Sequence, residues 1–286
     1  MSDNRTPRAC IAGWPVAHSR SPLIHGYWLR SLAVAGQYDR AAVPPGTFVQ
    51  FAATIGENGL VGANVTVPHK EAAFAACDKL TANAADLGAV NTLWRENGAL
   101  CGDNTDIAGF LLNLDEQAPD WRRDAAAAVV IGAGGAARAV ISGLLARGVE
   151  KIAVVNRTLE RAERLAAHFG RMTSAHAPKA LPRLLERAGL LINSSSLGMA
   201  GQPALDVDLS PLRSEAIVVD LVYVPLETPL LAAARSRGLR AVEGLGMLLH
   251  QAAPGFERWF GARPSVTAEL RALIEADIAN PREQRP

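Results

Sequence analysis

Cysteine is scarce in this sequence of 286 residues, which contains only three. Cys10, Cys77 and Cys101 are an odd number, are widely spaced, and form neither a C-x-x-C pair nor another metal-ligand pattern. Such thiols do not build a disulfide framework, so we expect free thiols in a reducing compartment. We interpret all three as small buried hydrophobic side chains, and we expect no metal site.

An excess of charge of one sign and a long hydrophobic run are also lacking. The formal net charge is only +1, which does not favour nucleic acid or an anionic membrane surface as a partner. No stretch approaches the ~20 apolar residues of a membrane span, because glycines and Arg138 interrupt the most apolar segment, 125–146. Residues 1–8 are polar and contain no signal-peptide core, so we expect a cytoplasmic protein with no membrane partner.

The chain does contain enough apolar residues to build a core. Hydrophobic residues make up 49% of the sequence and charged residues 20%, a balance typical of globular proteins. A domain usually takes ~100–200 residues, so we expect two domains.

Strand and helix patterns alternate in the first hundred residues. Residues 89–94 and 99–101 flank Asn97-Gly98, a turn signal that predicts a β-hairpin. Ser21 and Pro22 are typical of a helix start, with Ser21 as the N-cap. The patterns predict strands over 9–13, 38–43 and 62–67, and helices over 21–35, 47–55, 70–77 and 81–87.

A second alternating region begins near residue 124. Its strands are apolar throughout, which predicts a parallel, doubly wound sheet with helices on both faces. The predicted strands are 126–131, 151–155, 190–193 and 216–221, and the predicted helices are 135–147 and 159–169. We expect the helices at 245–260 and 266–278 to return to the first sheet. The fold class is therefore α/β with two domains, a split substrate domain (1–106 plus 244–286) and a Rossmann-type domain (107–243).

A glycine-rich turn follows the strand predicted at 126–131. Residues 132–137 read Gly-Ala-Gly-Gly-Ala-Ala, the G-x-G-x-x-A form of the dinucleotide fingerprint. The glycines allow the backbone to approach a pyrophosphate closely, and the helix start offers free N–H groups. We therefore expect a dinucleotide to contact Gly132, Ala133, Gly134, Gly135 and Ala136.

The end of the next strand favours NADP over NAD. NAD enzymes usually carry a carboxylate here, which bonds the ribose 2′-hydroxyl, whereas this strand ends in Asn156-Arg157-Thr158. A guanidinium pairs with a 2′-phosphate through charge-assisted hydrogen bonds, and a carboxylate would repel it. Arg161 lies four residues after Arg157 and is expected to join it.

Three polar clusters before residue 107 are poorly explained by packing. They lie at 18–22, at 64–70, and at 91–92 together with 102–106, each near a strand end or a helix start. Ligands of open α/β sheets bind at such positions. The hydroxyls, amides, ammonium and carboxylates of these clusters suit a small polyhydroxylated acid.

Together with the glycine-rich turn, these clusters closely resemble the shikimate dehydrogenase family. The resemblance covers residues 11 to about 260, with the motifs in the family's order. The motifs are Gly-Trp-Pro-Val-Ala-His-Ser-Arg-Ser-Pro, Gly-Ala-Asn-Val-Thr-Val-Pro-His-Lys, Gly-Ala-Val-Asn-Thr, Gly-Asp-Asn-Thr-Asp, Gly-Ala-Gly-Gly-Ala-Ala-Arg, Asn-Arg-Thr and Gly-Leu-Gly-Met-Leu.

The resemblance implies NADP-dependent, reversible reduction of 3-dehydroshikimate to shikimate, a step in aromatic amino acid biosynthesis. It implies that Ser19 and Ser21 hold the substrate carboxylate and that Lys70 and Asp106 are catalytic. The other implied substrate residues are Asn64, Thr66, Asn91, Tyr223 and Gln251. Implied cofactor contacts include Ser195 and Gly244. At position 195 the family usually has threonine. At position 243, directly before Gly244, this sequence has Glu243 where the family frequently has aspartate.

Ketone reduction places negative charge on oxygen, so a proton donor must lie beside it. Lys70 and Asp106 are the candidates, and the sequence leaves open which of them transfers the proton. His18, His69 and His250 flank motif residues and are interpreted as structural.

Other readings stay open at this point. One is a relative that acts on quinate, or on both acids, with broader cofactor use. Another is a non-catalytic NADP-binding sensor. Five scattered tryptophans are explained by core packing as well as by an interface, so a homodimer is an open alternative.

Overall fold

The computed structural model describes residues 6–123 and 125–280, and the chain divides into two compact units. The first unit comprises residues 1–106 and 249–286, and the second comprises residues 107–248. The chain enters the second unit at the start of helix α5 (Asp106–Gln117) and returns within helix α10 (Leu245–Phe260). The first unit is therefore built from two separate segments of the sequence.

The first unit contains a six-stranded mixed sheet with the order β2-β1-β3-β5-β6-β4. The strands are β1 (Arg8–Gly13), β2 (Gln37–Ala42), β3 (Leu60–Val65), β4 (Lys79–Leu80), β5 (Thr92–Glu96) and β6 (Ala99–Asp103). β1, β2 and β3 run parallel, whereas β5 is antiparallel to both β3 and β6. The hairpin predicted around Asn97-Gly98 is thus confirmed, and Asn97 adopts a φ of 51° there.

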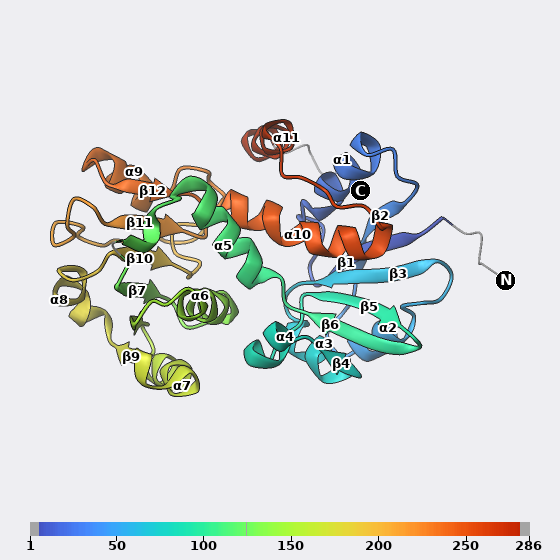
Figure 1. Ribbon diagram of the computed structural model, residues 1–286, viewed down its shortest axis with the longest axis horizontal. Helices are drawn as coiled ribbons and strands as arrows, with labels where there is room; N and C mark the ends of the chain where they lie inside the picture. Colours follow the sequence, from blue (N-terminus) through green and yellow to red (C-terminus); the bar gives the residue numbers. More distant parts are fainter. Residues whose placement is uncertain (1–5, 124, 281–286) are drawn as a thin grey trace. The chain divides into compact units, whose positions relative to one another are not determined.

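Helices cover both faces of this sheet (Figure 1). Helices α2 (Phe48–Ala53), α3 (Lys70–Ala76) and α4 (Ala82–Leu87) contribute Phe48, Ala73 and Ala84 to the core on one face. Helix α1 (Ser21–Ser31) covers the other face. The prediction of Ser21 as its N-cap was wrong: Arg20 is the N-cap and Ser21 is the first helical residue, because the Ser21 hydroxyl is used elsewhere.

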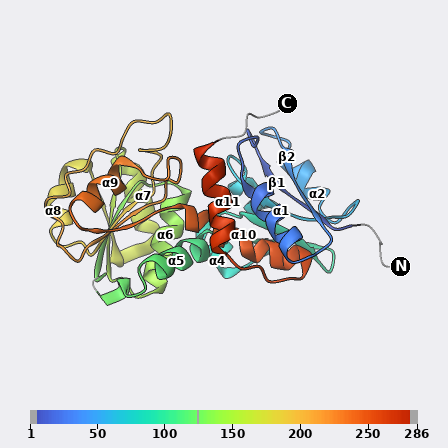
Figure 2. The same cartoon turned by 90° about the horizontal axis from the view of Figure 1, so that it is seen from above.

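The C-terminal helices pack on the first unit. In α10, Trp259 donates its indole N–H to the Leu93 carbonyl at 3.0 Å. In α1, Trp28 donates to the Ser265 carbonyl, just before helix α11 (Ala268–Ala279), at 2.9 Å. Figure 2 shows α11 beside α1, where Tyr27 and Thr267 share a hydrogen bond of 3.0 Å. The predicted return of these helices to the first sheet is therefore seen.

The second unit contains a six-stranded, wholly parallel sheet with the order β12-β11-β10-β7-β8-β9. Counted from β7, this is the strand order of doubly wound dinucleotide-binding folds. The strands are β7 (Ala127–Ile131), β8 (Lys151–Val155), β9 (Thr173–His176), β10 (Leu190–Asn193), β11 (Ile217–Asp220) and β12 (Arg240–Val242).

Helices lie on both faces of this sheet as well. Helix α6 (Gly135–Ala146) contacts α5 and α7 (Leu159–Phe169), since Leu111 lies close to Gly143. On the other face, α8 (Leu181–Leu185) and α9 (Pro229–Ser236) contribute Leu185 and Leu230 to a buried cluster with Val129 and Val155. Short 3-10 turns occur at Trp121–Arg123, Gly170–Met172 and Pro178–Ala180.

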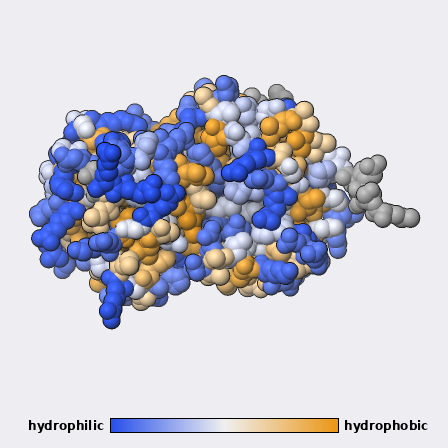
Figure 3. Space-filling view, viewed as in Figure 1, coloured by the Kyte–Doolittle hydropathy of each residue, from blue (hydrophilic) through white to orange (hydrophobic). Residues whose placement is uncertain are grey.

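The face shown in Figure 3 mixes hydrophilic and hydrophobic residues. Large exposed hydrophobic side chains do occur, such as Val67 and Val49. Within residues 6–123 and 125–280, none of the helices combines the length and apolar character required to cross a membrane.

Candidate active site

One edge of the first sheet gathers all three polar clusters. Because β1 and β3 are parallel, the segments that follow them emerge at the same edge. β5 runs antiparallel to β3, so its first residue, Thr92, pairs with Asn64 near the end of β3. Thr92 also pairs with Asp103 at the end of β6. The strand directions therefore bring together residues that are distributed between positions 18 and 106 of the sequence.

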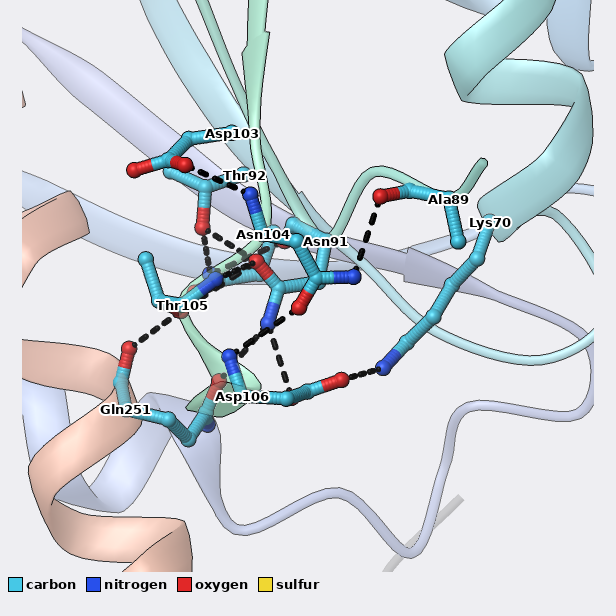
Figure 4. Close-up of polar contacts among 10 residues, drawn as sticks. Lys70, Ala89, Asn91, Thr92, Asp103, Asn104, Thr105, Asp106 and Gln251 are labelled. Atoms are coloured by element: carbon cyan, nitrogen blue, oxygen red, sulfur yellow. Dashed lines mark hydrogen bonds and ion pairs between the residues drawn. The ribbon is translucent and has the colours of Figure 1, made fainter. Parts of the chain in front are cut away.

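Lys70 and Asp106 form an ion pair at this edge, with 2.5 Å between Lys70 Nζ and Asp106 Oδ2 (Figure 4). Lys70 is the first residue of α3 and Asp106 is the first residue of α5. Their side chains are 30% and 14% exposed, so the pair is shielded but still open to a ligand. The ammonium therefore has a fixed position and can donate a proton to a neighbouring oxygen.

Asn91 orients the carboxylate of this pair. Its side-chain N–H donates to Asp106 Oδ1 at 2.9 Å, and its own oxygen accepts from the Thr105 N–H at 3.0 Å and from the Thr92 hydroxyl at 2.9 Å. Those donors leave only one orientation for the Asn91 amide. Both carboxylate oxygens of Asp106 are therefore engaged, one by Lys70 and one by Asn91.

Gln251 joins the same network from α10. The Asn91 side-chain N–H lies 3.4 Å from Gln251 Oε1, and the Thr105 hydroxyl donates to the Gln251 carbonyl at 2.8 Å. Figure 4 shows Gln251 approaching Thr105 and Asp106 from the helix. The returning C-terminal segment thus contributes directly to this edge of the first unit.

The second cluster supplies Asn64 and Thr66. Asn64 is buried, and its side-chain N–H groups donate to the Asn91 carbonyl and the Thr92 hydroxyl, both at 3.3 Å. Thr66 directly follows β3, is half-buried, and donates its backbone N–H to the Ala12 carbonyl at 2.9 Å. His69, by contrast, is buried against Phe48, and its Nε2 lies 2.7 Å from the Val43 carbonyl, in line with a structural role.

The first cluster brings the two serine hydroxyls together. Ser19 Oγ donates to Ser21 Oγ at 3.2 Å and accepts from the Ser21 backbone N–H at 3.3 Å. Two residues that sequence reasoning missed hold this segment: Arg40 donates to the Ser19 carbonyl at 2.7 Å, and Asp277 accepts from Arg20 Nε at 2.9 Å. Neither lies in a motif, so only the fold reveals them.

The glycine-rich turn of the second unit has the geometry that its sequence predicts. Gly132 has a φ of +108°, and a Cβ atom there would lie 2.8 Å from Ser194 Oγ. Around Gly134 and Gly135, by contrast, a Cβ would meet nothing within 4 Å. The backbone at the start of α6 is therefore accessible to a ligand. Ala137 is fully buried and allows α6 to pack closely on the sheet.

The segment after β8 presents two arginines at the start of α7. Asn156 bonds the Thr158 carbonyl through its side-chain N–H at 2.8 Å, which fixes the turn between strand and helix. Arg157 and Arg161 are exposed, and neither has a carboxylate partner within 4 Å among the described residues. Two unneutralised guanidinium groups thus stand at the carboxyl end of β8.

A buried network behind Ser195 was not predicted from the sequence. Asn193 accepts from the Ser195 hydroxyl at 2.7 Å and donates to Asp220 Oδ1 at 2.9 Å. Thr228 donates to the other Asp220 oxygen at 2.7 Å. Burial raises the pKa of Asp220, which these hydrogen bonds oppose. The network fixes the loops at the carboxyl ends of β10 and β11.

The remaining predicted residues also lie in the second unit. Tyr223 is half-buried and follows β11. Gly244 is buried directly before α10, where a Cβ would lie only 2.4 Å from the Leu221 carbonyl oxygen. No other residue type fits at Gly244 without displacing the backbone.

The fold and these two sets of residues define a two-domain, dinucleotide-dependent oxidoreductase. Three family models match the chain: the shikimate dehydrogenase substrate binding domain over residues 11–93, shikimate / quinate 5-dehydrogenase over 116–221, and the shikimate 5'-dehydrogenase C-terminal domain over 244–274. The NADP(+) shikimate dehydrogenase of Methylocella silvestris is 56% identical over 272 residues, covering 95% of this chain and 97% of the relative. The chain therefore belongs to the shikimate dehydrogenase family.

Solved structures agree with this family. A Thermus thermophilus shikimate 5-dehydrogenase, in complex with NADP(H) and shikimate, is 36% identical with a TM-score of 0.82, covering 94% of this chain and 99% of that one. A Corynebacterium glutamicum quinate dehydrogenase in complex with NAD is 29% identical with a TM-score of 0.87, covering 95% and 99%. The predictions of the family and of the two-domain α/β fold class are confirmed.

Proposed function

We propose that this enzyme catalyses the reversible, NADP-dependent reduction of 3-dehydroshikimate to shikimate. The observation that carries the proposal is the Lys70–Asp106 ion pair in a ring of amides and hydroxyls, in a chain whose second unit holds the dinucleotide turn. The curated relatives share this assignment in their names, NADP(+) shikimate dehydrogenase.

We assign the binding of a small polyhydroxylated acid to the first unit. Ser19 and Ser21, whose hydroxyls lie 3.2 Å apart, are proposed to hold its carboxylate. The hydroxyls on the ring of this acid are proposed to form hydrogen bonds with the side-chain amides of Asn64, Asn91 and Gln251 and with the hydroxyl of Thr66. Tyr223 is proposed as a further substrate-binding residue.

The protein's part in the chemistry is to supply a proton at the ketone oxygen. Bound NADPH would supply a hydride for the ketone carbon, so the protein has to provide a proton where negative charge develops on the ketone oxygen. The Lys70 ammonium, held by Asp106, donates a proton to that oxygen and yields the alcohol. In the reverse direction the neutral Lys70 amine accepts the proton. The Asp106 carboxylate holds Lys70 Nζ in place in both directions of the reaction.

We assign the cofactor to the carboxyl edge of the second sheet. The pyrophosphate is proposed to bind the turn formed by Gly132, Ala133, Gly134, Gly135 and Ala136, where the backbone is accessible. The unneutralised Arg157 and Arg161, with Asn156 and Thr158, are proposed to hold the 2′-phosphate. Ser195 and Gly244 are proposed to contact the nicotinamide half.

An absorbance assay of the reduced nicotinamide tests the proposal, with shikimate or quinate crossed with NADP⁺ or NAD⁺. We expect the highest kcat/KM for shikimate with NADP⁺. A preference for quinate with NAD⁺ would instead favour the activity named for the Corynebacterium glutamicum relative. Tight NADP⁺ binding without turnover of either acid would favour a non-catalytic sensor.

We further propose a cytoplasmic homodimer. The described cysteines are all free thiols, which suits a reducing compartment. Cell fractionation tests the location, and light scattering coupled to gel filtration tests the assembly, for which a mass near twice 30.2 kDa is expected.

A further inference from the structure

Tyr38 lies behind the polar edge of the first unit and contacts one of its residues directly. Its hydroxyl donates to Asn64 Oδ1 at 2.6 Å, and both residues are buried. Tyr38 is the second residue of β2, which is separated from β3 by β1, and it belongs to none of the motifs in the sequence. The register explains the contact, because Tyr38 and Asn64 lie on the same face of the sheet.

The Tyr38 hydroxyl and the Asn91 carbonyl together determine which way the Asn64 amide points. With Oδ1 facing the Tyr38 hydroxyl, the side-chain N–H groups face the Asn91 carbonyl and the Thr92 hydroxyl. If the amide were reversed, its oxygen would face the Asn91 carbonyl oxygen, which offers no proton. A series of hydrogen bonds thus runs from Tyr38 through Asn64 to the segment that carries Asn91.

The same series of hydrogen bonds continues to the ion pair of Lys70 and Asp106. Asn91 donates to Asp106 Oδ1 at 2.9 Å, and Asp106 Oδ2 binds Lys70. Hydrogen-bond networks that are mostly buried hold their members in place, because an unpaired polar group inside the protein is costly. The position of the Tyr38 hydroxyl is therefore coupled to that of the reacting ammonium.

The phenol ring of Tyr38 is itself held by an aromatic cluster. The His25 ring stacks on it with centroids 3.8 Å apart and an interplanar angle of 2°, and Trp259 lies 6.0 Å away. Burial lowers the pKa of His25 to about 3, so the imidazole is neutral. Burial also raises the pKa of Tyr38 well above its usual value, so its hydroxyl remains a donor.

We propose that Tyr38 is a positioning residue of this active site, which acts through Asn64 by fixing its amide and does not itself touch the substrate. The inference rests on the proposed function, since it assigns Asn64 to the binding of a substrate hydroxyl. It makes β2 and the aromatic cluster beneath it part of the machinery that shapes the substrate site.

The test compares Tyr38→Phe with Tyr27→Phe. Both changes remove one hydroxyl of the first unit, which bonds Asn64 in the case of Tyr38 and Thr267 in the case of Tyr27, and Tyr38→Phe keeps the stacking on His25. We expect Tyr38→Phe to raise KM for shikimate about three- to tenfold, the size of one lost hydrogen bond. KM for NADP⁺ should stay unchanged, and Tyr27→Phe should leave both constants as in the wild type.

A purely structural role would lower the folded fraction and hence kcat, but would not raise KM for shikimate alone. A double-mutant cycle with Asn64→Ala therefore follows: Tyr38→Phe should have little further effect on KM once Asn64 is absent. Equal effects of Tyr38→Phe in both backgrounds, or a KM for shikimate within twofold of wild type, would overturn the proposal.

A readout without substrate separates this inference from the proposed function. In NMR spectra of the whole protein, proton exchange of the Asn64 side-chain amide should rise at least about tenfold in Tyr38→Phe and not in Tyr27→Phe. If exchange is unchanged, Tyr38 does not hold the amide and the inference fails, whatever the enzyme's substrate is. If exchange rises but wild-type protein does not oxidise shikimate, the amide contact stands and the substrate assignment fails.

Discussion

Single side chains decide the chemistry of this protein, and Lys70 is the clearest case. Its ammonium lies at the polar edge and is held by Asp106. We expect Lys70→Ala to reduce kcat by about 10²- to 10⁴-fold, with a smaller change in KM. Lys79→Ala is the matched control, because Lys79 is an exposed lysine of the same unit. An unchanged kcat in Lys70→Ala, measured in steady-state assays, would remove Lys70 from the mechanism.

Arg157 is expected to determine cofactor preference. Arg157→Ala should raise KM for NADP⁺ about 10- to 150-fold, the range for a lost charge-assisted hydrogen bond, while KM for NAD⁺ stays nearly constant. The control is Arg164→Ala, which changes an exposed arginine of the helix that follows Arg157 and should alter neither constant. Equal losses for both cofactors in Arg157→Ala would show that this guanidinium does not read the 2′-phosphate.

His25 makes stability depend on pH. Burial lowers its pKa from 6.5 to about 3, so between these values the unfolded chain binds a proton that the folded protein does not. The free energy of unfolding therefore decreases as the pH falls through this window. His25→Phe should flatten the dependence by up to about 1.4 kcal/mol per pH unit.

Urea unfolding followed by tryptophan fluorescence measures this dependence. Four tryptophans report on the first unit, in which His25 lies: Trp14, Trp28, Trp94 and Trp259. Parallel pH profiles for the wild type and His25→Phe between pH 4 and pH 6.5 would contradict the assignment.

At the level of whole elements, turns and helix starts carry the function. The turn between β7 and α6 needs glycine at position 132, both for its φ of +108° and for its contact with Ser194. Gly132→Ala should destabilise the protein by about 1–2 kcal/mol from backbone strain alone, and should also weaken NADP⁺ binding. Gly148→Ala is the control, because Gly148 has a φ of +84° with nothing within 4 Å of an added Cβ.

The two variants should therefore separate in a binding titration. We expect both variants to lose melting temperature, Gly132→Ala more because its Cβ also meets Ser194, and weaker NADP⁺ binding only in Gly132→Ala. Wild-type affinity in Gly132→Ala would mean that the turn tolerates a side chain and does not approach the pyrophosphate closely.

Element prediction succeeded for many segments with a strong hydrophobic period, but it missed short edge strands and also the twelve-residue helix α5. The strand Lys151–Val155 and the helix Leu159–Phe169 were predicted with their observed bounds. The edge strands β9 and β12 were missed because they are brief and only partly buried. Helix α9 was also missed, although Thr228 caps it and Pro229 opens it, which is a readable start signal.

At the scale of the whole molecule, the first unit depends on both segments of the chain. His25, Trp28 and Tyr38 pack against Phe256 and Trp259, which only α10 supplies. We expect residues 1–106 alone to remain unfolded, because that aromatic face would lie in water. Residues 107–248 have a complete parallel sheet and their own core, and should fold and bind NADP⁺ alone.

Circular dichroism melts of residues 1–106 and of residues 107–248 measure whether each fragment folds cooperatively. Adding residues 249–286 to the first fragment through a flexible linker should restore a cooperative transition. A cooperative melt of residues 1–106 alone would show that the returning helices are dispensable for folding.

The sequence by itself determined the family, the two α/β domains, the dinucleotide turn and the residues of the polar clusters. Those features depend on residues that are close together in the sequence: the spacing of glycines, apolar runs of strand length, and short motifs that follow one another in a fixed order. Only the tertiary structure decided the partners that come from distant segments, such as Tyr38 on Asn64, Arg40 on Ser19 and Asp277 on Arg20. Their positions carry no local signal, because strand order and register alone bring them to the residues they hold.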